Sequence, residues 1–345
     1  MAVGQGSLIS PLSYLGLGRE TTYGTVTTCT AALNFVSASL KTLKETKILE
    51  QVETSRTYSK RIGLGKVIEG EMEFYVDANN TAFAYLMENA FGGAITSATA
   101  NGAAFTHTFQ IGNVADLSYT SLCINSRKGE SSGGMVFEYS GARVNEFNFS
   151  SELDEALKCT SALIIKDSTM TSNDVASALT GRQTSCLNFD NGRLSIESTV
   201  AALTTTSFWH IQSVEFGLSN NLKGDSESRR IGSDTLQVLP TGMANITLNF
   251  TMRFDTTTAY DAMLAETKLS AQIEFLGDTL TGSTDREGLR MDFPEIYISD
   301  AGDPAIGGPD EIISAEITCM VLRDDSSASG YALQSVLTNL VSSYA

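Results

Sequence analysis

Apolar and polar residues alternate with a period of two along most of the chain, which is the pattern of a β-strand with one buried face. Two segments show the alternation most clearly, residues 66–77 and residues 244–254. Their polar positions are Glu69, Glu71 and Glu73 in the first segment, and Asn245, Thr247, Asn249 and Thr251 in the second. Further strands are predicted over residues 31–41, 117–125, 135–140, 143–151, 156–166, 187–197, 208–218, 270–276, 289–298 and 311–322. The pattern and the abundance of Thr, Ser, Val and Ile predict an all-β chain.

Helical periodicity is limited to short segments. Residues 80–90 have apolar positions at helical spacing, begin at Asn80 as an N-cap and stop before two glycines. Residues 257–266 repeat this pattern. A third helix is predicted to close the chain, because apolar residues recur at helical spacing over residues 333–344, and the short segment 173–179 is its expected counterpart in the first half. We therefore expect a β-fold with short flanking helices.

The chain contains the same order of signals twice. Residues 59–63 (SKRIG) recur as residues 228–232 (SRRIG). Each copy is followed by a strand, a polar cluster, a short helix and an apolar run that ends in a charge pair. We predict two tandem modules, residues 1–180 and residues 181–345. A duplication of this kind favours a symmetric assembly over a catalytic site, because it multiplies interfaces.

Two long polar segments interrupt the strands, at residues 42–65 and 217–242. Long excursions inside compact domains are usually functional or disordered, and we interpret both as arms that contact other subunits. The predicted contact residues are Lys44, Glu45, Lys47, Glu50, Glu53, Arg56, Lys60 and Arg61 in the first arm, and Arg229 and Arg230 in the second. The alternative is a solvated surface loop, since charge-rich runs are common on free faces.

Composition narrows the class of protein. The 345 residues carry a formal net charge of −17, which argues against general nucleic-acid affinity because phosphate binding needs Lys and Arg. Five scattered cysteines without a CxxC pair, and only two histidines, leave little material for a zinc site, so no cofactor is predicted. Scattered thiols fit assembly in a cytosol. With no signal-peptide pattern and no apolar stretch long enough to span a bilayer, membrane insertion is not expected.

The candidate catalytic and metal-binding residues are better explained as parts of turns, loops and strands. Residues 129–133 match G-x-S-x-G with Ser131 in the nucleophile position, but a polar stretch before a strand favours a hairpin turn. Asp300, Asp303, Asp310 and Glu311 could offer oxygen ligands to calcium, yet they lack EF-hand spacing and an acidic loop is the better interpretation. His107 and His210 neighbour aromatic or β-branched residues, which favours histidines embedded in strands. A hydrolase that uses Ser131 with either histidine is the weakest alternative.

Four further segments carry recognisable motifs, namely residues 15–25 (LGLGRETTYGT), 68–71 (IEGE), 91–93 (FGG) and 139–147 (YSGARVNEF). Together they resemble segments of a family of bacteriophage tail tube (major tail) proteins from long-tailed phages. The resemblance is strongest over residues 14–167. It is weaker in the second copy, which lacks a clear counterpart of the ETTYG run.

The resemblance implies two tandem tail-tube modules, each a β-sandwich or half-barrel whose strands join those of its neighbours in a closed ring. Rings of this family stack into a hollow tube, part of the virion tail, through which phage DNA passes without specific binding. The implied partners are further copies of the chain, a tape measure protein, and tail terminator and distal tail proteins, with assembly in the cytoplasm of the bacterial host.

Three expectations about the assembly follow from this resemblance. Two modules per chain imply three chains per ring, because such rings typically hold six modules. The polar positions Glu69, Glu71, Glu73, Asn245, Thr247, Asn249 and Thr251 are expected to face the lumen, with bulk solvent outside the tube as the alternative. The charged residues of the two arms are expected to cross between stacked rings. The alternatives in function are a secretion-type tube or ring protein and a capsid decoration or spike protein.

Overall fold

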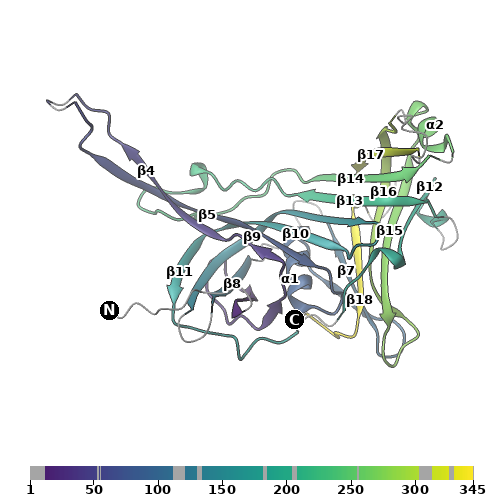
Figure 1. Ribbon diagram of the computed structural model, residues 1–345, viewed down its shortest axis with the longest axis horizontal. Coiled ribbons are helices and arrows are strands. Elements are labelled where there is room, and N and C mark those ends of the chain that lie inside the picture. The colour runs from purple at the N-terminus through teal and green to yellow at the C-terminus, as the bar shows by residue number, and fades with distance from the viewer. Residues whose placement is uncertain are drawn as a thin grey trace.

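The structure is a computed structural model of the chain. It describes residues 12–52, 54, 56–111, 121–129, 134–181, 185–203, 208–254, 256–302, 313–325 and 330–344. Figure 1 shows a body of antiparallel strands from which one hairpin projects far to the upper left. The described part of the chain is mostly β-structure, as the sequence predicts.

The strands and helices are distributed over the whole length of the chain. The first half contains β1 (Tyr14–Glu20), β2 (Ala31–Leu33), β3 (Ser37–Ala38), β4 (Lys41–Ile48), β5 (Arg61–Tyr75), α1 (Thr81–Phe91), β6 (Thr96–Thr99), β7 (Phe105–Gln110), β8 (Ser121–Lys128), β9 (Met135–Glu152), β10 (Lys158–Ile165) and β11 (Asp167–Thr171). The second half contains β12 (Gly192–Glu197), β13 (Ile211–Ser219), β14 (Asn245–Arg253), α2 (Thr258–Leu264), β15 (Leu269–Thr279), β16 (Arg286–Asp300), β17 (Ser314–Leu322) and β18 (Gln334–Asn339). Short 3₁₀ turns lie at Phe189–Asn191, Val200–Ala202 and Ser226–Ser228.

The two halves have the same strand order. In the first half, neighbouring strands pair in the order β4-β5-β10-β9-β8-β1. In the second half the order is β13-β14-β17-β16-β15-β12. The last strand of each half also folds back in the same way, since β11 pairs with β9 and β18 pairs with β16. A helix follows the second strand of each series, α1 after β5 and α2 after β14.

The halves are joined through both backbone and side chains. Strand β13 pairs with the C-terminal part of β9, and β18 pairs with β7. A single hydrophobic core contains residues of both halves. Aromatic rings of this core bridge the junction between the halves. The ring centroid of Phe216 lies 5.7 Å from that of Phe149 and 5.8 Å from that of Phe293. The two series of strands therefore form one continuous sheet system.

Both short helices occur where the sequence predicts them. In α1 the side chain of Asn80 accepts a hydrogen bond from the backbone N–H of Phe83, and Gly92 ends the helix in the left-handed region with φ of 74°. Phe83 packs against Phe74 and Phe149, with ring centroids 6.2 Å apart in each pair. Helix α1 therefore covers the apolar face of the sheet.

The prediction of a C-terminal helix is wrong. Residues 334–339 form strand β18, which is held between β16 and β7, and the following residues are irregular. Leu333, Ser335, Leu337 and Asn339 are all fully buried, so the true period is two and includes two polar residues. Residues 173–179, predicted as the counterpart helix, form a turn. Residues 42–65, predicted as a loop, belong largely to the hairpin of β4 and β5.

The C-terminal residues fasten the end of the chain to the first half. Tyr344 is buried, its ring lies 4.5 Å from that of His107, and its hydroxyl accepts a hydrogen bond from Asn339 at 2.6 Å. We expect Tyr344→Ala to lower the free energy of unfolding by about 3 kcal/mol, as for other buried aromatic truncations. Chemical denaturation measures this, with Ser343→Ala as the exposed control. An equal effect of both changes would contradict a specific contribution from Tyr344.

Candidate functional site

The polar positions of the two clearest strands lie on the same side of one sheet. Residues paired directly across neighbouring strands share a face. One cross-strand row runs through Glu71, Ala162, Glu146, Ser219 and Asn245. The next row runs through Glu73, Thr160, Asn148, Gly217, Thr247 and Met320. The sheet β5-β10-β9-β13-β14-β17 therefore presents one unbroken face that spans both halves, which we call the polar face.

The opposite side of this sheet is the hydrophobic core. Met72, Phe74 and Leu248 are at most 1% exposed, whereas Glu69, Glu71 and Thr247 between such positions are exposed. Asn245 is also exposed, and Glu73, Asn249 and Thr251 are half-buried. Because α1 packs on the core side, the polar face is the side of the sheet that the chain itself leaves mostly open.

Carboxylates dominate the charge of the polar face. They are Glu69, Glu71 and Glu73 of β5, Glu146 and Glu152 of β9, Glu215 of β13 and Glu316 of β17. The cations on or beside this face include Arg253 at the end of β14, Lys41, which is 3.4 Å from Glu69, and Lys158, which is 2.6 Å from Glu155. The two ion pairs are open to solvent and therefore weak. The polar face thus presents a net negative, hydrated surface.

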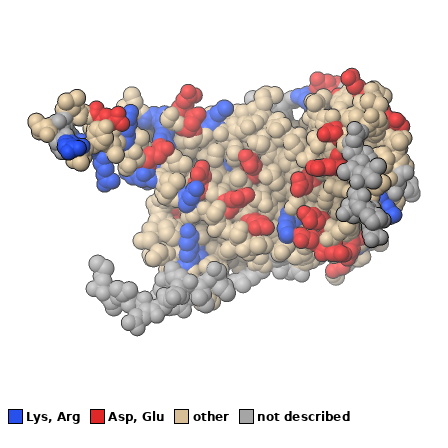
Figure 2. All heavy atoms as spheres, turned by 45° about the horizontal axis from the view of Figure 1, so that its top comes forward, with Lys and Arg blue, Asp and Glu red and all other residues tan. Residues whose placement is uncertain are grey.

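The projecting hairpin is the second distinctive surface. Every residue of β4 is exposed, and so are Lys60, just before β5, and Arg61, its first residue. Apolar residues on the hairpin are also open to solvent, with Ile48 at 55% and Val52 at 106% exposure. Figure 2 shows lysines and arginines gathered on and near this arm, while aspartates and glutamates spread over the body. The hairpin therefore combines positive charge with uncovered apolar surface.

The predicted contact residues of the first arm that the structure describes lie on this hairpin or its base. Lys44, Glu45, Lys47, Glu50, Arg56, Lys60 and Arg61 are exposed. Glu53 lies outside the described residues. Arg230 of the second arm is exposed, whereas the side chain of Arg229 is only 13% exposed.

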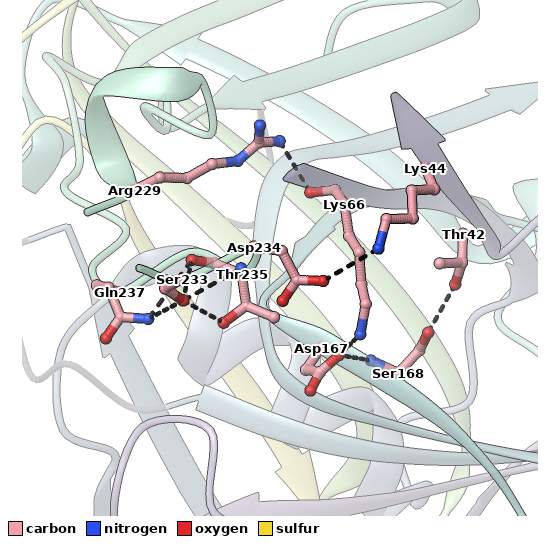
Figure 3. A network of polar contacts seen from close by, with 10 residues as sticks. All are labelled: Thr42, Lys44, Lys66, Asp167, Ser168, Arg229, Ser233, Asp234, Thr235 and Gln237. Atoms are coloured by element: carbon pink, nitrogen blue, oxygen red, sulfur yellow. Dashed lines mark hydrogen bonds and ion pairs between the residues drawn. The ribbon is translucent and has the colours of Figure 1, made fainter. Parts of the chain in front are cut away.

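The second arm was predicted over residues 217–242, but residues 217–219 belong to β13, so from here the name denotes residues 220–244, between β13 and β14. The second arm lies against the base of the hairpin (Figure 3). Arg229 donates a hydrogen bond to the backbone oxygen of Lys66 at 2.8 Å and lies 3.3 Å from the carboxylate of Glu45. Lys44 reaches Asp234 at 3.6 Å. Three residues predicted to contact another ring, Lys44, Glu45 and Arg229, are therefore engaged with partners in their own chain.

The hairpin base is also tied to strand β11. Lys66 pairs with Asp167 at 3.0 Å, and this hydrogen bond raises the pKa of the lysine ammonium. A hydrogen bond of 2.7 Å joins the hydroxyls of Thr42 and Ser168 (Figure 3). The root of the hairpin is thus held from both the second arm and the body.

Comparison with known proteins identifies the family. Residues 11–321 match the family model described as phage tail tube protein. The chain belongs to the phage tail tube protein family. It is therefore a structural component of the virion tail that assembles with copies of itself into a tube.

Comparisons with curated proteins and with solved structures give no further information about the function of this tail tube protein. No curated protein matches the chain. A solved structure titled "Crystal structure of Hcp protein" matches 52% of this chain and 88% of that chain, with 9% identity and a TM-score of 0.25. A TM-score of 0.25 does not indicate a shared function. The tail tube family is structural and is not normally enzymatic.

The candidate catalytic and calcium-binding residues that the structure describes lie in or beside strands of this tail tube protein. His107 is fully buried, and burial lowers the pKa of its imidazole. Its Nε2–H donates to the backbone oxygen of Val341 at 2.8 Å, and its Nδ1 lies 2.8 Å from the hydroxyl of Ser97. His210 lies beside Trp209 and Arg253 in a shallow pocket. Asp300 ends strand β16. Ser131, Asp303, Asp310 and Glu311 lie outside the described residues.

No group of three or more His, Cys, Asp or Glu side chains within the described ranges could hold a metal ion. No helix in the same part of the chain is both long and apolar enough to cross a membrane.

Proposed function

We propose that this tail tube protein forms rings of three chains, which stack into a tube whose channel is lined by the polar face. The observation that carries the proposal is the identical strand order of the two halves, which supports two tandem modules, residues 1–180 and 181–345. Three chains then supply six equivalent modules around the channel.

The junction between the two halves suggests how neighbouring chains join. Strand β13 is paired on one edge with β14 and on the other with β9. Its counterpart β4 pairs with β5 alone among the described strands, so its outer edge is open there. Open strand edges invite pairing with another chain. In the ring, the second half of a neighbouring copy pairs with the open edge of β4. This contact corresponds to the pairing of β9 with β13 within the chain.

The polar face suits the channel for a physical reason. A sheet that continues from chain to chain closes into a barrel, and one of its faces must line the interior. The core side is already occupied by α1 and buried aromatic rings, which leaves the polar face for the hydrated channel. Its carboxylates repel the phosphates of DNA, so the DNA slides without binding.

The hairpin suits the contact between stacked rings. It carries basic residues, including Lys47, Lys60 and Arg61, in a protein whose net charge is −17. A basic arm with exposed apolar residues complements the acidic body of another copy. Each exposed ion pair contributes little, but the contacts repeat around every ring and add up. Arg230 of the second arm joins these contacts, and the tape measure, terminator and distal tail proteins bind the finished tube, with assembly in the host cytoplasm.

The symmetry of the ring tests the proposal. Tubes assembled from the purified chain, viewed along their axis by cryo-electron microscopy, should show three chains per ring with a pseudo-sixfold outline. Mass measurement of isolated rings gives an independent count. A ring of six chains would overturn the tandem-module assignment and make the second half an outer decoration.

A further inference from the structure

We propose that the second arm acts as a brace that fixes the direction of the hairpin, with Arg229 as the positioning residue. The inference rests on the proposed function, because the direction of the hairpin matters where one ring meets the next. It assigns different roles to the two repeated segments: the first reaches outward, and the second holds the first in place.

The brace continues the sheet where strand β10 ends. Strand β10 pairs with β5 as far as Ile68. Beyond that point the backbone N–H of Lys66 donates to the backbone oxygen of Asp234 at 2.8 Å. The backbone oxygen of Lys66 accepts a hydrogen bond from Arg229, also at 2.8 Å. The second arm thus satisfies both backbone groups of Lys66 along the edge of β5 that β10 has left.

Side chains tie the same arm to the other strand of the hairpin. Arg229 lies 3.3 Å from Glu45, and Asp234 lies 3.6 Å from Lys44. Glu45 and Lys44 belong to β4, whereas Lys66 belongs to β5. Because both strands are held, the hairpin cannot pivot about its root without breaking these contacts (Figure 3). The side chain of Arg229 contacts both strands of the hairpin, because its guanidinium carries several donors in a fixed fork.

The brace is itself anchored to the body. Leu222, Leu236 and Leu239 form a small buried cluster that packs against Tyr23 and Ile164. Arg143 of β9 donates to the backbone oxygen of Leu239 at 2.7 Å, and Asn145 accepts from the backbone N–H of Leu222 at 2.8 Å. These contacts join the second arm to the body as well as to the hairpin. The second arm therefore transmits the rigidity of the sheet to the hairpin root.

Gly65 leaves the space that the Arg229 guanidinium occupies. A Cβ atom at position 65 would overlap that guanidinium. At Gly63, two residues earlier on the same strand, a Cβ atom would meet only the Cε of Lys44 at 3.6 Å, an ordinary contact. Gly65→Ala thus displaces Arg229 without changing any charge, and Gly63→Ala is its matched control.

The first test uses hydrogen exchange of the unassembled chain. We expect Gly65→Ala and Arg229→Ala to accelerate exchange of the Lys66 amide and of the β4 amides about tenfold, the effect of losing one hydrogen bond. Gly63→Ala should exchange like the wild-type chain at these positions. Strand β10, in the core, should be unchanged in all three variants, which separates loss of the brace from loss of the fold. Unchanged exchange at Lys66 and β4 would overturn the brace, whatever happens to tube formation.

The second test uses assembled tubes. Gly65→Ala and Arg229→Ala should slow tube elongation about tenfold relative to Gly63→Ala, while rings of normal size still form. A hairpin whose direction is not fixed loses conformational entropy when it binds the next ring, which weakens that contact. Wild-type elongation together with accelerated exchange would overturn the link between the brace and stacking. A wild-type chain that forms no tubes would instead remove the proposed function, and the exchange comparison would still decide whether the brace exists.

Discussion

Deletion of residues 44–56 is expected to give a folded chain that cannot extend a tube. The deletion removes the hairpin from Lys44 outward, including the contacts of Lys44 and Glu45 with the second arm. The described side chains it removes are exposed or, at Leu49, half-buried, so the hydrophobic core is untouched. It also removes Lys44, Lys47 and Arg56 together with the exposed apolar residues Ile48 and Val52. We expect the yield of tubes to fall at least about a hundredfold, because repeated weak contacts are lost together. Negative-stain microscopy measures the tubes, and circular dichroism with size-exclusion chromatography checks the fold.

A subtler variant separates the surface of the hairpin from its length. Serine in place of Ile48, Val52 and Tyr58 keeps the hairpin but removes side chains that are 55%, 106% and 62% exposed. This variant should also elongate poorly. The matched control is Met170→Ser, which removes an apolar side chain that is 71% exposed on β11, away from the hairpin tip. Tubes of normal length from the deletion variant would refute the role of the hairpin in stacking.

Reversing the charge of Glu69, Glu71 and Glu73 is expected to block DNA passage while tubes still assemble. Lysines at these positions would pair with phosphates and release their counterions, so a surface that repels DNA would become one that binds it. We expect delivery of DNA by phage that carry the triple Lys variant to fall at least about tenfold, with partial recovery at higher salt. The measurement compares DNA release from particles whose tails have wild-type length.

The matched control replaces the same three glutamates by glutamine. It removes negative charge without adding positive charge, so it should affect delivery far less than lysine does. Wild-type delivery by the lysine variant, or a tube structure with these side chains on its outer surface, would show that the polar face does not line the channel.

The period of two predicted much of the fold because one face of each clear strand is buried in the core. The glutamates at 69, 71 and 73 and the polar residues at 245 to 251 were therefore grouped correctly on the exposed side of their strands. That the two groups share one face depends on the pairings of β10, β9 and β13 between them. Those pairings are tertiary and leave no local trace in the sequence.

The errors have equally specific causes. Leu333, Leu337 and their neighbours satisfy helical spacing, but pairing with β16 and β7 on both edges overrides that local preference. The hairpin strand β4 is exposed on both faces, so it lacks the alternation that marks a strand. Strands β1, β6, β7 and β11 were not predicted either. All four are only four to seven residues long, and β1 is almost entirely buried whereas β6 is exposed throughout, so neither of these two alternates. The partner of Arg229 lies 163 residues earlier in the chain, beyond any pattern that spacing can show.

The pairing of β13 with β9 has a consequence for how a ring comes together. In a ring of three such chains, every second junction between modules is made inside a polypeptide and is present before any encounter. Such a junction has no concentration dependence, so assembly loses the translational entropy of three bodies rather than six. In such a ring the covalent link would also free the two modules to diverge, because they would always alternate around it. With hairpins at alternate positions, one such ring would seat on the next in three equivalent orientations instead of six.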